Sequence, residues 1–213
     1  ARNAGLIQSS AVVLRALSRR LDDPDLLLTT TLLEATALVR SGRNRQGLGA
    51  CEAVRANPEA VVSVENQDLL ANCLVEGYLA LSRWKKIEQL VEGEITRIEQ
   101  AHGSDHPKLI KFLRARSMAR MHASDFERAS ADIDRAYRIA SQAYGASPMV
   151  FRTRVQKARI LLWKKDYPAA RALGNTLLNE IPTGERRFLP VLVELETVLA
   201  MVEFYKSEVA EVP

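Results

Sequence analysis

The sequence predicts an all-α fold, a right-handed superhelical array of antiparallel helix hairpins with about nine helices. Trp84, Phe126 and Tyr167 each open a similar segment, and they stand 42 and 41 residues apart. Apolar residues recur at three- and four-residue intervals along nearly the whole chain, as on amphipathic helices. The period-two alternation of strands never persists, and no Asn-Gly or Asp-Gly hairpin signal occurs. A period near 42 indicates stacked units that bury their apolar faces only against one another.

The N-terminal elements are bounded by strong helix stop and start signals. A first helix is expected at 6–21, and an Asp-Asp-Pro run ends it. Asp23 is then the N-cap of the second helix and Pro24 lies in its first turn, because an Asp oxygen accepts free N–H groups and proline needs none. This helix extends to about Arg40, and a Ser-Gly-Arg-Asn turn leads into a third helix at about 45–56.

The central elements follow the same signals. A fourth helix is expected to end at about Ser82, and Trp84 opens a long helix that ends near His102. Pro107 starts the next helix because proline suits a first helical position. The turn after it carries Ser124 and Asp125, either of which can cap the following helix.

The C-terminal part of the chain is predicted to hold four helices with tight turns between them, at 126–144, 148–163, 167–180 and 185–205. Short connections make sequential helices neighbours. We therefore expect one domain over 1–213. Its repeats fall at about 24–57, 65–103, 107–145 and 148–181, and its flanking helices at 6–21 and 185–205.

Composition excludes several classes of protein. The chain has 213 residues, of which 47% are hydrophobic and 26% are charged, which suits a domain with ample apolar surface to bury. No segment approaches the roughly 18 charge-free apolar residues of a membrane span. The two cysteines, Cys51 and Cys73, lie within apolar helical patterns. We interpret them as buried thiols in a reducing compartment, which predicts a cytoplasmic location; a disulfide between them is the alternative.

The repeat resembles the tetratricopeptide repeat (TPR), in the version of about 42 residues found in kinesin-light-chain-like arrays. In that family a small residue precedes the turn by several positions, an aromatic follows the turn, and a second small residue follows three positions later. Ser117 with Ala129 and Ala158 with Ala170 stand at these places. The segment after Gly103 resembles the family's Gly-x-Asp-His-Pro connection. The Trp84 unit departs from the pattern, with Val75 and Ile87 at the small positions.

The resemblance also implies where a partner would bind. The family's concave positions lie fifteen, twelve, eleven and eight residues before the aromatic. In this chain they are Leu69, Asn72, Cys73, Glu76, Lys111, Arg114, Ala115, Met118, Arg152, Val155, Gln156 and Arg159.

The polar members of this set form a mostly basic strip. Arginine forks pair bidentately with carboxylates, and amide side chains can bond a peptide backbone. The strip therefore predicts an acidic peptide or protein segment as partner, with a solvated basic face as the alternative. Met118, Met121 and Leu162 could instead hold an apolar anchor. The candidate partner-binding residues are Asn72, Lys111, Arg114, Arg152, Gln156 and Arg159.

Signals of catalysis and of cofactors are missing from the sequence. No phosphate loop, dinucleotide fingerprint, nucleophile elbow or His-Glu-x-x-His motif occurs. His102 and His106 are four residues apart, but a Gly-Ser turn separates them, so we interpret His106 as a connection or capping residue and expect no metal. The acid pair Asp132 and Asp134 is interpreted as part of a solvated helix face. We expect neither enzyme activity nor a cofactor.

These observations together predict a protein-protein interaction module, an adaptor or scaffold. The first alternative is a regulatory or sensor domain of a larger bacterial signalling protein or transcriptional activator, with which a chain opening at Ala1 is compatible. The second is nucleic-acid binding, because residues 101–175 hold 15 Lys or Arg and 6 Asp or Glu side chains. Few exposed aromatics and no recognition element accompany that charge. We also expect that the terminal helices, with the apolar run 189–199, could form a homo-oligomer.

Overall fold

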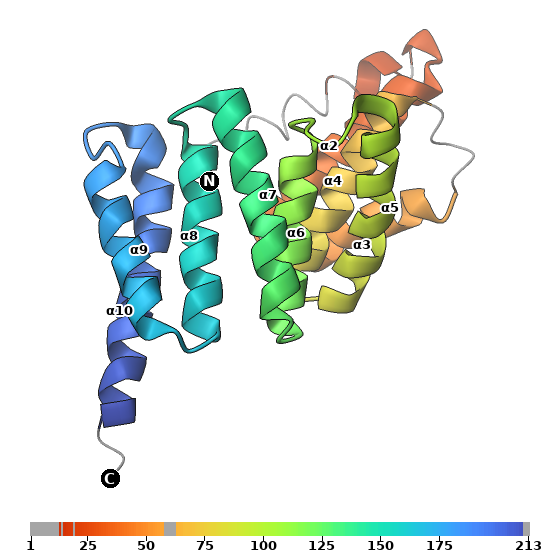
Figure 1. Ribbon diagram of the computed structural model, residues 1–213. Helices are drawn as coiled ribbons and strands as arrows, with labels where there is room; N and C mark the ends of the chain where they lie inside the picture. Colours follow the sequence, from red (N-terminus) through yellow and green to blue (C-terminus); the bar gives the residue numbers. More distant parts are fainter. Residues whose placement is uncertain (1–12, 14, 19, 58–62, 211–213) are drawn as a thin grey trace. The chain divides into compact units, whose positions relative to one another are not determined.

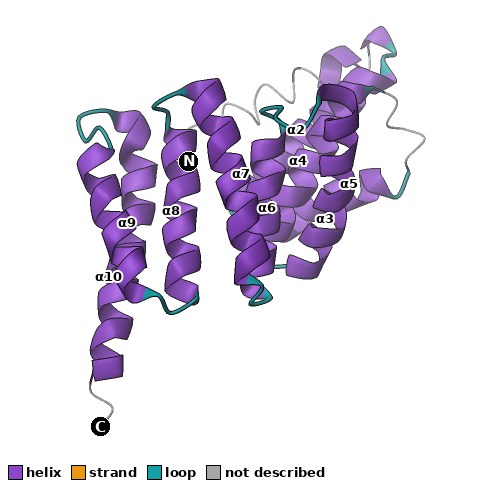
Figure 2. Ribbon diagram, in the orientation of Figure 1, coloured by secondary structure: helices purple, strands orange, loops and turns teal. Residues whose placement is uncertain are grey.

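A computed structural model describes residues 13, 15–18, 20–57 and 63–210 (Figures 1 and 2). Every regular element within these residues is a helix, so the all-α prediction is confirmed. The helix expected at 6–21 falls largely outside them, although those described between 13 and 21 are helical. No helix in the described ranges is long and apolar enough to cross a membrane.

Contacts within the chain divide it into two compact units, residues 1–90 and 91–213, which are described separately. The single domain with its four repeats therefore stays a prediction. The first unit holds α2 (Pro24–Arg40), α3 (Asn44–Arg55), α4 (Val64–Ala80) and the beginning of α5 (Trp84–His102). The second holds the rest of α5, then α6 (Leu109–His122), α7 (Phe126–Tyr144), α8 (Pro148–Trp163), α9 (Tyr167–Glu180), the 3₁₀ turn η2 (Arg186–Phe188) and α10 (Leu189–Ala210).

The expected helix boundaries agree with these within a few residues, and two differences have local causes. Helix α6 begins at Leu109 because its N–H donates to the carbonyl of His106, in a tight turn, instead of continuing from Pro107. The Nδ1 atom of His106 accepts from the N–H of Lys108 at 3.3 Å, so His106 belongs to the connection before α6, one of the two roles expected for it. Helix α10 extends to Ala210, five residues beyond the expected end.

The hairpin turns share one hydrogen-bond pattern. The third residue after the first helix of each hairpin donates its N–H to a carbonyl five residues back, and the residue before it has a positive φ. This is a Schellman motif, which satisfies the last carbonyls of a helix. It occurs in the four hairpins as Arg43 to Leu38, Arg83 to Tyr78, Asp125 to Arg120 and Asp166 to Leu161, each at 2.9 Å. The backbone therefore repeats even where the residue types do not.

Small residues let the paired helices approach closely, as the resemblance implied. Ser117 is fully buried, and its Oγ donates to the carbonyl of Ala129 on α7 at 2.8 Å. Ala158 and Ala170 are fully buried at the corresponding places of α8 and α9. Gly47 has the same role in the first unit, since a Cβ there would lie 2.5 Å from the carbonyl oxygen of Ala35. That hairpin therefore follows the packing pattern although no aromatic opens its second helix.

The two cysteines correct an expectation. Cys51 on α3 and Cys73 on α4 are both fully buried, as predicted, but they form a disulfide rather than standing as free thiols. The helices bring their Cα atoms to 6.3 Å, a separation that a disulfide spans. The spacing of 22 residues could not reveal this proximity, which depends on how α3 packs against α4. The cytoplasmic location rested on free thiols, so it stays a prediction without that support.

Candidate functional site

Five of the six candidate residues lie in the second unit, on helices α6 and α8. Lys111 and Arg114 belong to α6, while Arg152, Gln156 and Arg159 belong to α8. Helix α8 contacts α6 on one side and α10 on the other (Figure 1), so these three helices form one layer of the unit. We call their shared surface the α6/α8/α10 face. The sixth residue, Asn72, is half-buried on α4 of the first unit.

Burial of the twelve concave positions depends on how many residues separate each one from the aromatic of its repeat. The position eleven residues before the aromatic is buried in all three repeats, where it holds Cys73, Ala115 and Gln156. The positions fifteen and eight residues before it are at least partly accessible in all three repeats. The physical reason is that the latter two are seven residues apart, about two helical turns, and share one outward line.

Gln156 joins two helices. It is 3% exposed, and its Nε2 atom donates to the carbonyl of Arg114 at 2.9 Å. This bond fixes the position of α8 along the axis of α6. The amide is thus already used inside the protein, and its role at the site is to position Arg114.

Two arginines of the face have buried, unsatisfied donors. Within the described residues, the Nε atoms of Arg114 and Arg152 are buried and have no hydrogen-bond acceptor. The Nη1 atom of Arg114 lies 3.9 Å from the sulfur of Met149, a weak acceptor. The Nε atom of Arg152 lies 3.8 Å from a carboxylate oxygen of Glu194 on α10, too far for a hydrogen bond. Such donors are costly to leave unpaired.

The charges on this face repel one another. Burial lowers the pKa of Arg114 from its usual value to about 10; Glu194 opposes this shift, whereas the charges of Arg152 and Arg159 add to it. Neighbouring positive charges create a positive potential on this face. An anion bound between the three guanidinium groups would relieve that repulsion.

An aromatic pair lies beside this charge. His122 at the end of α6 meets Trp163 at the end of α8 edge to face, with ring centroids 4.9 Å apart. Trp163 is 44% exposed. Burial, followed by the charge of Arg159, lowers the pKa of His122 below its usual value of 6.5. Sequence reasoning missed this pair, although its separation of 41 residues equals the repeat period.

The apolar anchor proposed from Met118, Met121 and Leu162 is wrong for two of its members. Met121 is 1% exposed and Leu162 is 3% exposed, so both belong to the core. Met118 alone is partly accessible. The repeat period places all three residues near the end of the first helix of a hairpin. Only the packing of that helix on the second helix decides which of its sides is buried.

Asp132 corrects the interpretation of the acid pair. It is 5% exposed and accepts from Nε and Nη2 of Arg116, at 3.0 and 2.7 Å, and from Nη1 of Arg120 at 2.8 Å. It is therefore the centre of a buried ion cluster between α6 and α7. Asp134 is exposed, as expected, with Lys157 at 2.5 Å.

Most of the other arginines of the basic stretch are also engaged. Arg135 pairs with Glu99 at 2.6 Å, and Arg154 pairs with Glu180. Arg138 lies 3.5 Å from Asp105. Arg159 differs, since it has no ion pair within the described residues.

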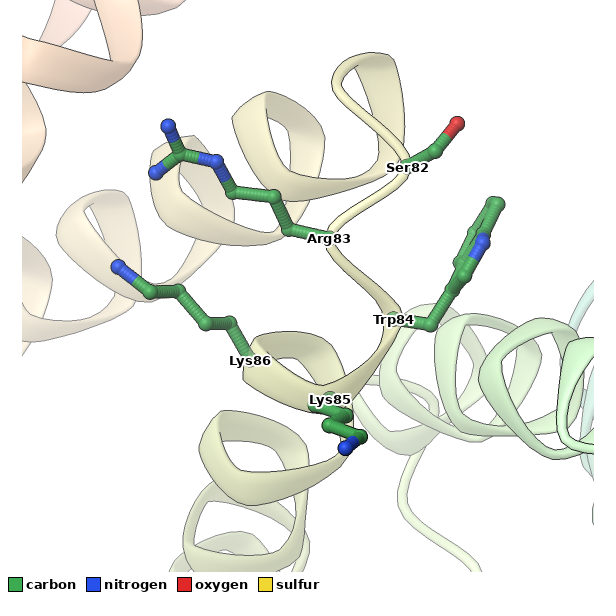
Figure 3. A pocket seen from close by; sticks show the side chains of 5 residues that line it. All are labelled: Ser82, Arg83, Trp84, Lys85 and Lys86. Carbon is green, nitrogen blue, oxygen red and sulfur yellow. The ribbon is translucent and has the colours of Figure 1, made fainter.

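The first unit has a pocket of its own at the turn between α4 and α5 (Figure 3). It measures about 300 Å³ and is lined by Ser82, Arg83, Trp84, Lys85 and Lys86. Arg83 and Lys86 point to the same side in Figure 3. Both form ion pairs with Glu52, at 3.3 and 3.0 Å. These two charges are partly neutralised, and the pocket walls are mostly the apolar parts of the side chains. No feature of it indicates a ligand.

His102 and His106 stack with ring centroids 4.4 Å apart at the connection between α5 and α6. Among the described residues there is no group of three or more His, Cys, Asp or Glu side chains that could hold a metal ion.

Comparison with known proteins extends these findings. No protein-family model matches the chain, and no curated protein matches its sequence. Solved structures do match its fold, and two of them are described here. BtubC (BKLC) from P. vanneervenii is 16% identical with a TM-score of 0.66, covering 99% of this chain and 87% of that one. A putative kinesin light chain from P. anserina, with nearly identical TPR-like repeats, is 14% identical with a TM-score of 0.62, covering 87% of this chain and 97% of that one. The repeats, their turns and these structures together show that the chain has the TPR-like fold of kinesin-light-chain-like repeat proteins.

Proposed function

We propose that the protein is an interaction module whose α6/α8/α10 face binds an acidic segment of a partner protein. TPR-like repeat folds commonly serve as scaffolds for protein partners, which supports the general class; the groove and the acidity of the ligand are our proposal. The observation that carries it is the pair of buried Nε donors on Arg114 and Arg152 beside Arg159, which has no ion pair in the part of the chain that the structure describes.

The three arginines have complementary tasks in this proposal. Arg114 and Arg152 offer N–H groups whose partners a carboxylate would supply, in surroundings where water is largely excluded. Arg159 supplies charge next to the exposed ring of Trp163, against which an apolar side chain of the ligand can pack. Gln156 keeps α6 and α8 in register, so the donors are held in place before the ligand arrives.

Lys111 and Asn72 are secondary members of the proposal. Lys111 lies one helical turn before Arg114 on α6 and extends the basic strip. Asn72 occupies the equivalent of the Arg114 position in the first unit, and its use by a ligand is proposed on that equivalence alone.

A library of short peptides tests the proposal. We expect acidic peptides to bind the wild-type protein, and the triple variant Arg114→Ala/Arg152→Ala/Arg159→Ala to lose that binding. The matched control is Arg128→Ala/Arg138→Ala/Arg171→Ala, which removes the same charge from exposed positions on α7 and α9. Equal loss in both triple variants would mean that only net charge matters, and the groove proposal would be wrong.

The same experiment separates the proposal from nucleic-acid binding. Short DNA and RNA oligonucleotides are measured beside the peptides at low and moderate salt. Nucleic-acid affinity falls steeply with salt because bound counterions are released. Tight binding of oligonucleotides without binding of acidic peptides would replace the proposal by the nucleic-acid alternative.

A further inference from the structure

Helix α10 continues the repeat of concave positions found on α6 and α8. Glu194 follows Arg152 by 42 residues, and Arg152 follows Lys111 by 41. Val198, which is 42 residues after the buried Gln156, is itself 1% exposed, whereas Glu194 is partly accessible. This matches the burial of the corresponding positions on α8, so α10 presents Glu194 on the same face as Arg152. The four equivalent positions on α10 are Glu194, Thr197, Val198 and Met201.

The charge of the concave positions changes sign at α10. Neither α6 nor α8 contains an Asp or Glu residue, and Lys111 and Arg152 hold the positions that match Glu194. Glu194 is therefore the one acid among the concave positions of these three helices. A segment that crosses the face from α6 to α10 meets two positive charges and then a negative one.

Glu194 acts on both arginines without satisfying their donors. A carboxylate oxygen of Glu194 lies 3.8 Å from Nε of Arg152, and the two side chains are 38% and 35% exposed. An ion pair this accessible contributes little to stability. Burial lowers the pKa of Arg114, and the charge of Glu194 opposes that shift. The buried Nε atoms of Arg114 and Arg152 nevertheless have no acceptor within the described residues.

An acidic ligand at this face would change the surroundings of Glu194. A ligand carboxylate that accepts from Nε of Arg152 lies close to the Glu194 carboxylate, because both groups approach the same guanidinium. The two like charges repel each other, and Glu194 shares its counter-ion with the ligand. A basic side chain of the ligand beside its acid removes both costs, since it pairs with Glu194 while the acid pairs with Arg152.

We propose that Glu194 determines which acidic segments bind, because it favours a partner with a basic side chain over α10 beside acidic residues over α6 and α8. This inference rests on the proposed function, since it requires the acidic residues to bind at Arg114 and Arg152. The partner is then a segment of mixed charge with a defined direction along the face. Repulsion from Glu194 discriminates against uniform polyanions, nucleic acids among them.

A charge scan of a bound peptide tests this role. The acidic peptide with the highest affinity in the library is used, and each of its residues is replaced in turn by lysine and by glutamate. At one position the wild-type protein should prefer lysine over glutamate by about threefold to fivefold in Kd, as expected for a partly exposed ion pair. Glu194→Gln should lose this preference, and Glu194→Lys should reverse it.

The matched control is Glu203→Gln on the same helix. Glu203 pairs with Arg171 on α9 at 3.0 Å, and its side chain is 51% exposed, so the change removes the same charge and also breaks an arginine pair. Glu203→Gln should keep the wild-type preference for lysine. Circular dichroism checks that each variant keeps the helical content of the wild-type protein.

The outcomes separate this inference from the proposed function. If an acidic peptide binds but no position shows the lysine preference, or if Glu194→Gln and Glu194→Lys both retain it, the role of Glu194 is wrong and the proposed function stands. Equal loss of the preference in Glu203→Gln also overturns it, because net charge then explains the effect. If no acidic peptide binds the wild-type protein, the proposed function fails and this inference fails with it.

Discussion

Removing the charge of Asp132 should destabilise the second unit more than any other single acid-to-amide change in the α6–α7 hairpin. The Asp132 side chain is 6% exposed, and those of Arg116 and Arg120 are 11% and 16% exposed. Asp132→Asn keeps the volume but replaces one acceptor oxygen with an NH₂ group that faces arginine donors. It leaves two cations largely buried without their shared counter-ion.

The expected magnitude follows from that burial. Breaking a buried ion pair by removing one partner costs about 3 to 5 kcal/mol. Arg116 keeps its 2.7 Å bond to Glu92, whose side chain is 62% exposed and therefore compensates only in part. We expect about 3 kcal/mol, the low end, and a fall in Tm of about 6 to 12 °C for a chain of this size.

Thermal and urea unfolding followed by circular dichroism measure this cost. The control is Asp134→Asn, two residues away on the same helix, whose partner Lys157 lies at 2.5 Å but whose side chain is 61% exposed. An exposed pair contributes at most about 1 kcal/mol. If Asp132→Asn and Asp134→Asn lower stability equally, the cluster does not hold the hairpin as we argue.

Three further predictions concern the disulfide, the site and the first unit. Replacing Cys51 and Cys73 by alanine should cost about 3 kcal/mol from loop closure over 22 residues, measured by urea unfolding; no change would mean that the pair does not constrain the chain. Arg159→Ala should raise the pKa of His122 in an NMR titration, because burial and then the Arg159 charge lower it; an unchanged pKa contradicts that contact. The hydrogen bond from Lys86 is the largest cause that lowers the pKa of Glu52 in the folded protein. The ionised Glu52 should therefore stabilise the fold above pH of about 4.5, and this stabilisation should be lost as the pH falls through the lowered pKa of the folded state. Glu52→Gln should remove a small part of the acid sensitivity, and equal acid unfolding curves for variant and wild type would contradict this.

The fold was predictable because its signals are local. Pro24, Asp125 and Asp166 mark helix starts by capping rules, and the small pairs at Ser117 and Ala158 mark close helix contacts. Each signal depends on a few neighbouring residues, and the repeat presents it several times. The turn geometry persists even where serine or lysine replaces glycine at positive φ, as at Ser124 and Lys165.

The site was less predictable because it depends on packing between distant helices. The period identified Arg114, Arg152 and Gln156 as members of one surface, but not that the Gln156 amide would bond to the Arg114 carbonyl. Nor could it separate Arg116, which is held by Asp132, from Arg159, because both lie in the same basic stretch. The cysteines are the same kind of case, since only the packing of α3 on α4 brings their sulfur atoms together.

The central claim is that buried arginine donors on the α6/α8/α10 face bind an anionic partner. The most direct test is to follow the arginine Nε–Hε signals by NMR while an acidic peptide that binds the protein is added. The account predicts that the signals of Arg114 and Arg152 move strongly as their N–H groups gain an acceptor, together with the indole signal of Trp163. Changes confined to Trp84 at the turn between α4 and α5, with the Arg114 and Arg152 signals unmoved, would contradict it.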